Sequence, residues 1–322
     1  MPSELQLFLR SLLDEVICNE KSIAPDGHVN LEAIKAIEHI PQFDFETPNP
    51  PIFFEYMPQE YLPPNPEPSP NFKDYDPSED SEETLTPADK SMRQFMRAME
   101  TSNLVDRHTY SVLWTRKLSY QLYPTSSFVV SASFMGDYDT SADFWHTQHF
   151  LEPEANIEDG HVYPHITIQL FQSKCGREDK ILYGEVIVLL TALRNRASQL
   201  HIKSTMERQE LEGLSIEELD EYGYAYEFPE EKVFPVLLVS YVGRRRARIL
   251  YACLDCGEEG IKVKICQSKP YSFERLKDAP IDFFARVLMS HPIRTDSQGG
   301  LSMSRESRQS YDLPTRSKAS TR

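Results

Sequence analysis

VFPVLLVSYV (233–242), ARILYACL (247–254) and IKVKIC (261–266) are three apolar runs separated by the turns GRRR and DCGEEG. Short apolar runs joined by glycine-containing turns are typical of neighbouring antiparallel strands. In the last run, isoleucine and valine alternate with Lys262 and Lys264, which indicates one buried face and one face in water. We therefore predict a three-stranded antiparallel meander.

Outward from the meander, HITIQLFQ (165–172) has the composition of a further strand. Apolar periodicity predicts a long helix over 179–200, and Pro280 begins a final helix, PIDFFARVLMSH (280–291). These elements predict the α+β class. We therefore expect an antiparallel sheet that includes the C-terminal meander and is flanked by helices.

Charge and proline content divide the 322 residues into four parts. Residues 41–90 hold 12 of the 23 prolines and −10 of the net charge of −16, which predicts an extended, disordered linker. Before it, Ser3 and Gln6 form a possible capping box, and residues 1–40 are predicted to be a helical hairpin. Residues 91–293 form the main domain, and 294–322 form a basic, serine-rich tail predicted to be disordered.

Composition narrows the expected location and partners. The first twenty residues lack the basic start of a secretory signal, and acidic residues interrupt their apolar positions. No apolar run is long enough for a spanning helix, and five cysteines in a chain of this length make a poor disulfide framework. We expect a cytoplasmic or nuclear protein that is not secreted and does not insert into membranes. The acidity makes nucleic acid an unlikely general partner.

The C-terminal third also resembles a loose group of filamentous-fungal proteins. The likeness rests on FPVLLVSYVGRRRARILYACLDCGEEGIKVKICQSKPYSF and FFARVLMSHPI, and it extends over residues 181–293. That group is similar in its strand–turn–strand pattern, its Ser-Lys-aromatic stretch and its final helix ending in Ser and Pro. The resemblance implies a shared packing pattern and no activity.

Four of the nine histidines lie within one segment, DFWHTQHFLEPEANIEDGHVYPH (143–165). If the first part is helical, Asp143, His146 and His149 share a face, and His161 and His165 point the same way if they lie on one strand. Two such faces could hold zinc or a non-heme iron. The alternative, that these are surface and turn histidines, is favoured because the spacing matches no strong metal motif. No cofactor is predicted, with a divalent metal as the alternative.

Cys253 and Cys256 form a CxxC pair, with Cys266 further along the meander. A zinc ribbon would need a second ligand pair, and a thioredoxin-like role would need the pair at the start of a helix. Structural cysteines are therefore the favoured interpretation.

Two groups are candidates for partner binding. Phe53, Phe54, Tyr56 and Tyr61 interrupt the acidic linker and either pack back on the core or dock a partner. Arg244, Arg245 and Arg246, with Arg248 close behind, crowd one turn. A solvated turn is the favoured interpretation, and the alternatives are phosphate contact, nuclear import or a site where the acidic linker docks.

An enzyme of the metal-dependent hydrolase or nuclease type is the alternative function. Glu185 on the predicted helix and Asp255 at a strand end are its candidate catalytic carboxylates. No acidic-x-Lys motif stands on the next strand, because Gly260 occupies the position two before Lys262. Phosphate-loop, dinucleotide, serine-hydrolase and HExxH motifs are also missing. We therefore expect a non-catalytic interaction or regulatory protein, whose partner and oligomeric state the sequence leaves open.

Overall fold

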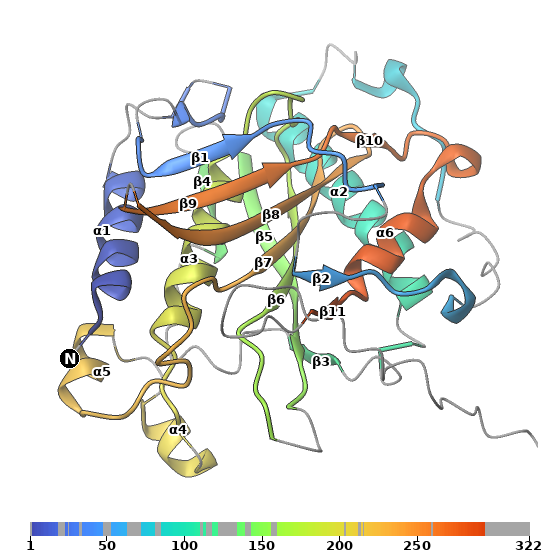
Figure 1. The fold of residues 1–322 in the computed structure, drawn as a ribbon. Coiled ribbons are helices and arrows are strands. Elements are labelled where there is room, and N and C mark those ends of the chain that lie inside the picture. The colour runs from blue at the N-terminus through green and yellow to red at the C-terminus, as the bar shows by residue number, and fades with distance from the viewer. Residues whose placement is uncertain are drawn as a thin grey trace, which may run out of the picture.

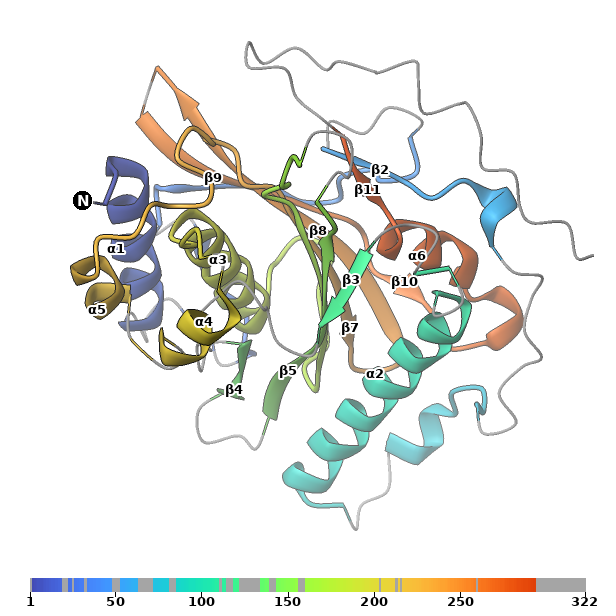
Figure 2. The ribbon, with the colours of Figure 1, turned by 90° about the horizontal axis from the view of Figure 1, so that it is seen from below.

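The computed structural model describes residues 2–18, 23–24, 26–31, 34–47, 53–62, 72–80, 85–109, 112–113, 118–121, 134–138, 143–155, 160–202, 204–211, 214, 216–258 and 260–293. One mixed sheet forms the centre of the molecule (Figure 1). Helices α1 and α3 cover one face of the sheet, and α2 and α6 cover the other (Figure 2). The combination of helices with a mostly antiparallel sheet confirms the predicted mixed class.

The main sheet has the strand order β1-β9-β8-β7-β6-β5-β3, with β10 beside β8 and β4 beside β5. Its members are β1 (Ile37–Ile40), β3 (Leu118–Gln121), β4 (Met135–Tyr138), β5 (Asp143–Pro153), β6 (Ile166–Gln172), β7 (Val236–Val242), β8 (Arg246–Gly257), β9 (Gly260–Gln267) and β10 (Tyr271–Ser272). A separate small ribbon pairs β2 (Phe54–Glu55) with β11 (His291–Pro292). The β7–β8 and β8–β9 pairs are antiparallel, whereas β6–β7 and β1–β9 are parallel.

The α-helices are α1 (Glu4–Cys18), α2 (Pro87–Thr109), α3 (Tyr183–Ala197), α4 (Thr205–Leu211), α5 (Ile216–Glu221) and α6 (Ile281–Leu288). Short 3-10 turns occur at η3 (Gln59–Tyr61), η4 (Pro77–Asp80) and η6 (Leu276–Asp278). Every residue of β6 and β7 is buried, as expected for central strands covered on both faces. Among the described residues, no helix is both long and apolar enough to cross a bilayer.

The N-terminal segment belongs to the main core. The predicted capping box is confirmed, because the Ser3 amide donates to Gln6 Oε1 at 2.7 Å and the Gln6 amide donates to Ser3 Oγ at 3.3 Å. Helix α1 then packs on α3. The prediction of a second helix in the N-terminal hairpin is wrong, because residues 37–40 form β1. This strand pairs in parallel with β9 and satisfies backbone groups that would otherwise form an open edge.

The predicted linker is folded where the structure describes it. Phe45, Phe54 and Met57 are buried in the core between the sheet and helices α2 and α6. Burial of three large apolar side chains outweighs the local preference of a proline-rich, acidic segment for extension. The predicted disordered tail, 294–322, lies outside the described residues, as do 48–52, 63–71 and 81–84 within the linker.

Candidate ligand pocket

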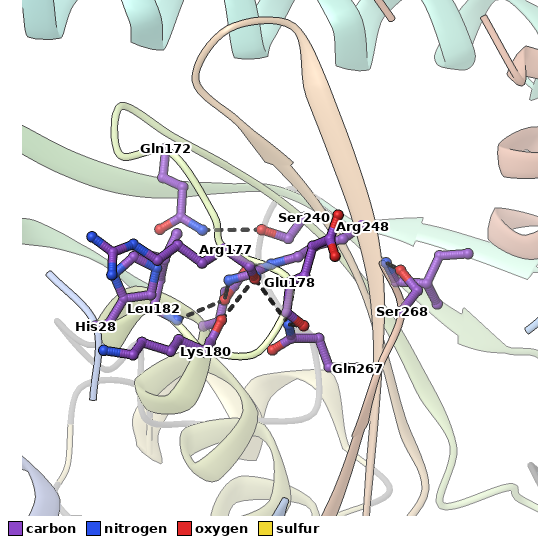
Figure 3. Close-up of polar contacts among 12 residues, drawn as sticks. His28, Gln172, Arg177, Glu178, Lys180, Leu182, Ser240, Arg248, Gln267 and Ser268 are labelled. Carbon is purple, nitrogen blue, oxygen red and sulfur yellow. Dashed lines mark hydrogen bonds and ion pairs between the residues drawn. The ribbon is translucent and has the colours of Figure 1, made fainter. Parts of the chain in front are cut away.

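Polar side chains cross five neighbouring strands on the sheet face that packs against α3. They are His39 on β1, Gln267 on β9, Arg248 on β8, Ser240 on β7 and Gln172 on β6. We call this set the polar row. Figure 3 shows its central part, where Gln172 Nε2 donates to Ser240 Oγ at 3.0 Å and Gln267 Nε2 donates to the carbonyls of Arg177 and Glu178.

Arg248 is the centre of the polar row. Its Nε donates to Glu185 Oε1 at 2.7 Å, and its Nη2 donates to Glu185 Oε2. Its Nη1 donates to the carbonyl oxygens of Arg177 and Lys180, which lie on the loop between β6 and α3 (Figure 3). Glu185 Oε2 also accepts the Leu182 amide at the start of α3. One guanidinium therefore joins a central strand, a helix start and a loop.

The centre of the polar row is closed to ligands. The side chains of Arg248 and Glu185 are both 0% exposed. Gly176 packs against the guanidinium so closely that an added Cβ would lie 2.8 Å from Arg248 Cζ. A fully hydrogen-bonded buried ion pair under a tightly packed loop has the features of a structural anchor.

The two candidate catalytic carboxylates are not brought together. Glu185 is bound to Arg248. Asp255 is exposed, and it lies seven residues beyond Arg248 on β8. At ~3.3 Å per residue, the strand positions of Arg248 and Asp255 are about 23 Å apart. A single metal ion could not bind both carboxylates in this arrangement.

The first part of the histidine segment forms strand β5 rather than the helix considered from the sequence. Asp143, His146 and His149 all lie on β5, so Asp143 and His149 are separated by about 20 Å along the strand. Asp143 binds Lys174 at 2.6 Å, and His146 stacks on Phe171. Among the described residues, no group of three or more His, Cys, Asp or Glu side chains could hold a metal ion.

The other two histidines have aromatic neighbours. His161 lies edge-on to Tyr163, with ring centroids 4.7 Å apart. His165 is buried beneath the β2–β11 ribbon against Phe54, with ring centroids 5.1 Å apart. Burial lowers the pKa of His165 to about 3, so its ring is neutral near pH 7.

His149 instead belongs to a buried network with α2. Its Nδ1 lies 2.6 Å from Gln169 Oε1 and 3.6 Å from Asp106 Oδ2. Gln169 Nε2 donates to Asp106 Oδ1 at 2.7 Å. Burial raises the pKa of Asp106 to about 6, although the hydrogen bond from Gln169 acts in the opposite direction. This network joins α2 to strands β5 and β6.

The aromatic partner candidates pack largely inward. Phe54 is buried, Phe53 and Tyr56 are partly buried against the core, and Tyr61 is 41% exposed. Packing back on the core is therefore the observed arrangement for the first three residues. Tyr61 alone presents a large apolar surface to solvent.

The arginine turn contacts the described part of the acidic linker. Arg245 lies over the ring of Phe72 at 4.1 Å and binds Glu100 at 2.8 Å. Arg246 lies 3.4 Å from Glu274, and the Arg244 amide donates to Gln94. Within the described part of the linker, Glu79 binds Arg97 on α2 at 2.7 Å and Glu46 lies 4.0 Å from Lys269, so neither of these ion pairs involves the turn.

A pocket of about 370 Å³ lies on the opposite side of the sheet from the polar row, over β8 and β9. Three backbone hydrogen bonds position its walls. The Phe43 amide donates to the Gln267 carbonyl, the Leu254 amide donates to the Val233 carbonyl, and the Ile293 amide donates to the Phe53 carbonyl. The lining consists of Ile40, Phe43, Phe53, Lys232, Val233, Tyr251, Cys253, Leu254, Asp255, Cys256, Lys264 and Cys266.

Three of the five cysteines line this pocket, which we call the thiol pocket. Cys253 and Cys266 are buried, and Cys256 is exposed at the rim, where its thiol lies 3.8 Å from the Lys232 carbonyl. All three are free thiols. Burial raises the pKa of Cys253 to about 11. It also raises the pKa values of Cys256 and Cys266. Protonated thiols are poor nucleophiles, so these groups form a polarisable apolar surface.

Sequence patterns identified the cysteines of this pocket but not its other walls. Ile40, Phe43 and Phe53 come from the segment predicted to be hairpin end and linker, and Lys232 and Val233 precede β7. No periodicity connects residues so distant along the chain. The pairing of β1 with β9, the pairing of β2 with β11 and the hydrogen bond from the Leu254 amide to the Val233 carbonyl bring them to the same place.

Comparison with known proteins gives no match, whether to a family model, to a curated protein or to a solved structure. The geometry of the thiol pocket therefore carries the functional proposal.

Proposed function

We propose that this chain is a non-catalytic binding protein, an interaction or regulatory module, and that the thiol pocket is its ligand site. The observation that supports it is a concave, mostly apolar site of about 370 Å³ with a few polar groups at its rim. Small-molecule sites in proteins generally have this character and volumes from about 300 Å³ upward.

The chemistry of the pocket favours binding over catalysis. Its thiols are held protonated, and the carboxylate of Asp255 stands at an exposed strand end. The buried carboxylate of Glu185, the other candidate for the hydrolase alternative, is neutralised by Arg248 on the far side of the sheet. Within the described residues, neither carboxylate has the partner that general acid–base or nucleophilic catalysis requires.

A neutral fluorescent probe tests the proposal. We expect 1-aminoanthracene to bind the full chain with a stoichiometry of one and an increase in fluorescence. Val233→Trp, which fills the pocket at a half-buried wall, should abolish this binding. Met206→Trp is the matched control, because Met206 is 72% exposed and lies outside the pocket.

Cysteine labelling gives a second readout of the same site. Cys175 and Cys256 are both exposed free thiols, but only Cys256 lines the pocket. Bound probe should slow alkylation of Cys256 by N-ethylmaleimide and leave Cys175 unaffected. Equal alkylation rates with and without probe, or probe binding that survives Val233→Trp, would show that the thiol pocket is not the ligand site.

A further inference from the structure

We infer that the thiol pocket takes a small apolar carboxylic acid, whose hydrocarbon part lies on the aromatic and thiol surface and whose carboxylate lies at two lysines. This inference rests on the proposed binding function and specifies its ligand class. Three charged side chains line the pocket, namely Lys232, Lys264 and Asp255, so the lining carries one net positive charge.

The two lysines are available to an anion. The exposed Lys232 has no ion-pair partner among the described residues. Lys264 faces a single carboxylate, that of Glu38, at 3.9 Å, and both of these side chains are substantially exposed. A contact this long between solvated groups is weak, so Lys264 retains most of its capacity to bind an anion.

The single acidic side chain of the lining is compensated within the sheet. Asp255 stands directly opposite Lys262 in the β8–β9 ladder. Opposite charges at such cross-strand positions attract each other. The lining itself therefore holds two lysines against one compensated carboxylate, which suits a monoanion better than a cation. The Glu231 carboxylate accepts the amides of Lys232 and Val233 and is not among the lining residues.

The remaining surface suits a hydrocarbon. Phe43 and Phe53 form part of the walls, and the ring centroids of Phe53 and Tyr251 are 6.5 Å apart. The buried thiols of Cys253 and Cys266 complete the lining. A ligand with an apolar body and one anionic group would match both parts of the pocket, and the protonated thiols make its binding reversible.

The test compares decanoate with decan-1-ol by calorimetry on the full chain, because the two probes share a chain length and differ in charge. Decanoate should bind at least about tenfold more tightly than decan-1-ol. Lys232→Met and Lys264→Met should each reduce that ratio to about threefold or less by weakening the binding of decanoate. Lys277→Met, on η6 and outside the pocket lining, is the control and should leave the ratio unchanged.

Salt dependence gives an independent criterion. Raising the ionic strength from about 0.02 M to about 0.5 M should weaken binding of decanoate and leave binding of decan-1-ol almost constant. Equal affinities for the two probes would overturn the inference while leaving the proposed binding function intact. If neither probe binds, the inference is wrong, and the proposed function fails with it only if 1-aminoanthracene does not bind either.

Discussion

Arg248 on β8 and Glu185 in the first turn of α3 form an ion pair that is entirely shielded from solvent. The same guanidinium holds the carbonyls of Arg177 and Lys180, and the same carboxylate holds the Leu182 amide. Each charge is therefore fully satisfied, and loss of either partner leaves the other buried without compensation. The pair connects the loop 173–182 and α3 to the sheet whose other face carries the thiol pocket.

Breaking this pair should destabilise the whole fold. Glu185→Gln leaves Arg248 charged in a dry environment, and we expect the free energy of unfolding to fall by about 3–5 kcal/mol. Urea denaturation followed by circular dichroism measures the change. Arg246→Met, which removes an exposed ion pair with Glu274, is the control and should change stability by at most about 1 kcal/mol. A small effect of Glu185→Gln would show that solvent reaches the polar row.

The N-terminal helix should contribute core stability. Leu13 is 0% exposed between α1 and the rest of the core, whereas Leu7 on the same helix is 52% exposed. Leu13→Ala should lower the free energy of unfolding by about 2–5 kcal/mol. Leu7→Ala should change it by less than about 0.5 kcal/mol, because that side chain is already in water. Similar losses for both variants would indicate that the outer face of α1 is also covered.

Asp106 should make stability depend on pH in a defined direction. Its folded-state pKa, about 6, lies above the ordinary value of 3.8, so its contribution is greatest at low pH and is lost as pH rises between these values. Asp106→Asn can still accept the hydrogen bond from Gln169. We expect the variant to be more stable than the parent by about 3 kcal/mol above pH 6.

Unfolding curves at several pH values test this difference. The parent and Asp106→Asn should converge below about pH 4, where the carboxyl is protonated in both folded and unfolded chains. Asp14→Asn, at an exposed position of α1, is the control and should follow the parent at every pH within about 0.5 kcal/mol. A constant offset between the parent and Asp106→Asn across the pH range would contradict the assignment.

His165 should act in the opposite direction. Its folded-state pKa, about 3, lies below the ordinary value of 6.5, so its contribution is present above pH 6.5 and is lost as pH falls toward 3. His165→Phe removes the titrating group and keeps an aromatic ring against Phe54. Relative to the parent, the variant should gain about 1.4 kcal/mol for each pH unit below 6. Parallel unfolding curves between pH 7 and pH 4.5 would show that this histidine does not titrate as expected.

Local patterns carried the prediction of several elements. Apolar runs at 165–172 and 233–266 correspond to strands, and Ser3 with Gln6 begins α1 as the capping box predicts. These features depend on residues close in sequence, where strand alternation and helix capping act directly. The same local rules misassigned residues 37–40, whose helical spacing of isoleucines yields to pairing with the open edge of β9.

The candidate sites show the same division. The sequence singled out Cys253, Cys256 and Cys266 and left their role open, and only the fold shows that all three line one pocket. It grouped Arg248 with the arginines of the turn, but Arg248 lies two residues inside β8, where its side chain is buried and binds Glu185. It also grouped histidines that the extended geometry of β5 holds far apart.

The sequence by itself determined the mixed class, the strand runs around 233–266 and the concentration of proline and negative charge in residues 41–90. These properties follow from composition and from periodicities of two and 3.6 residues, which need no partner elsewhere in the chain. Tertiary structure decided that the N-terminal segment supplies a strand, that part of the linker packs into the core and that a thiol-lined pocket forms over β8 and β9. Those outcomes depend on apolar burial and backbone pairing between residues far apart along the chain, whose contributions exceed the local preferences of each segment.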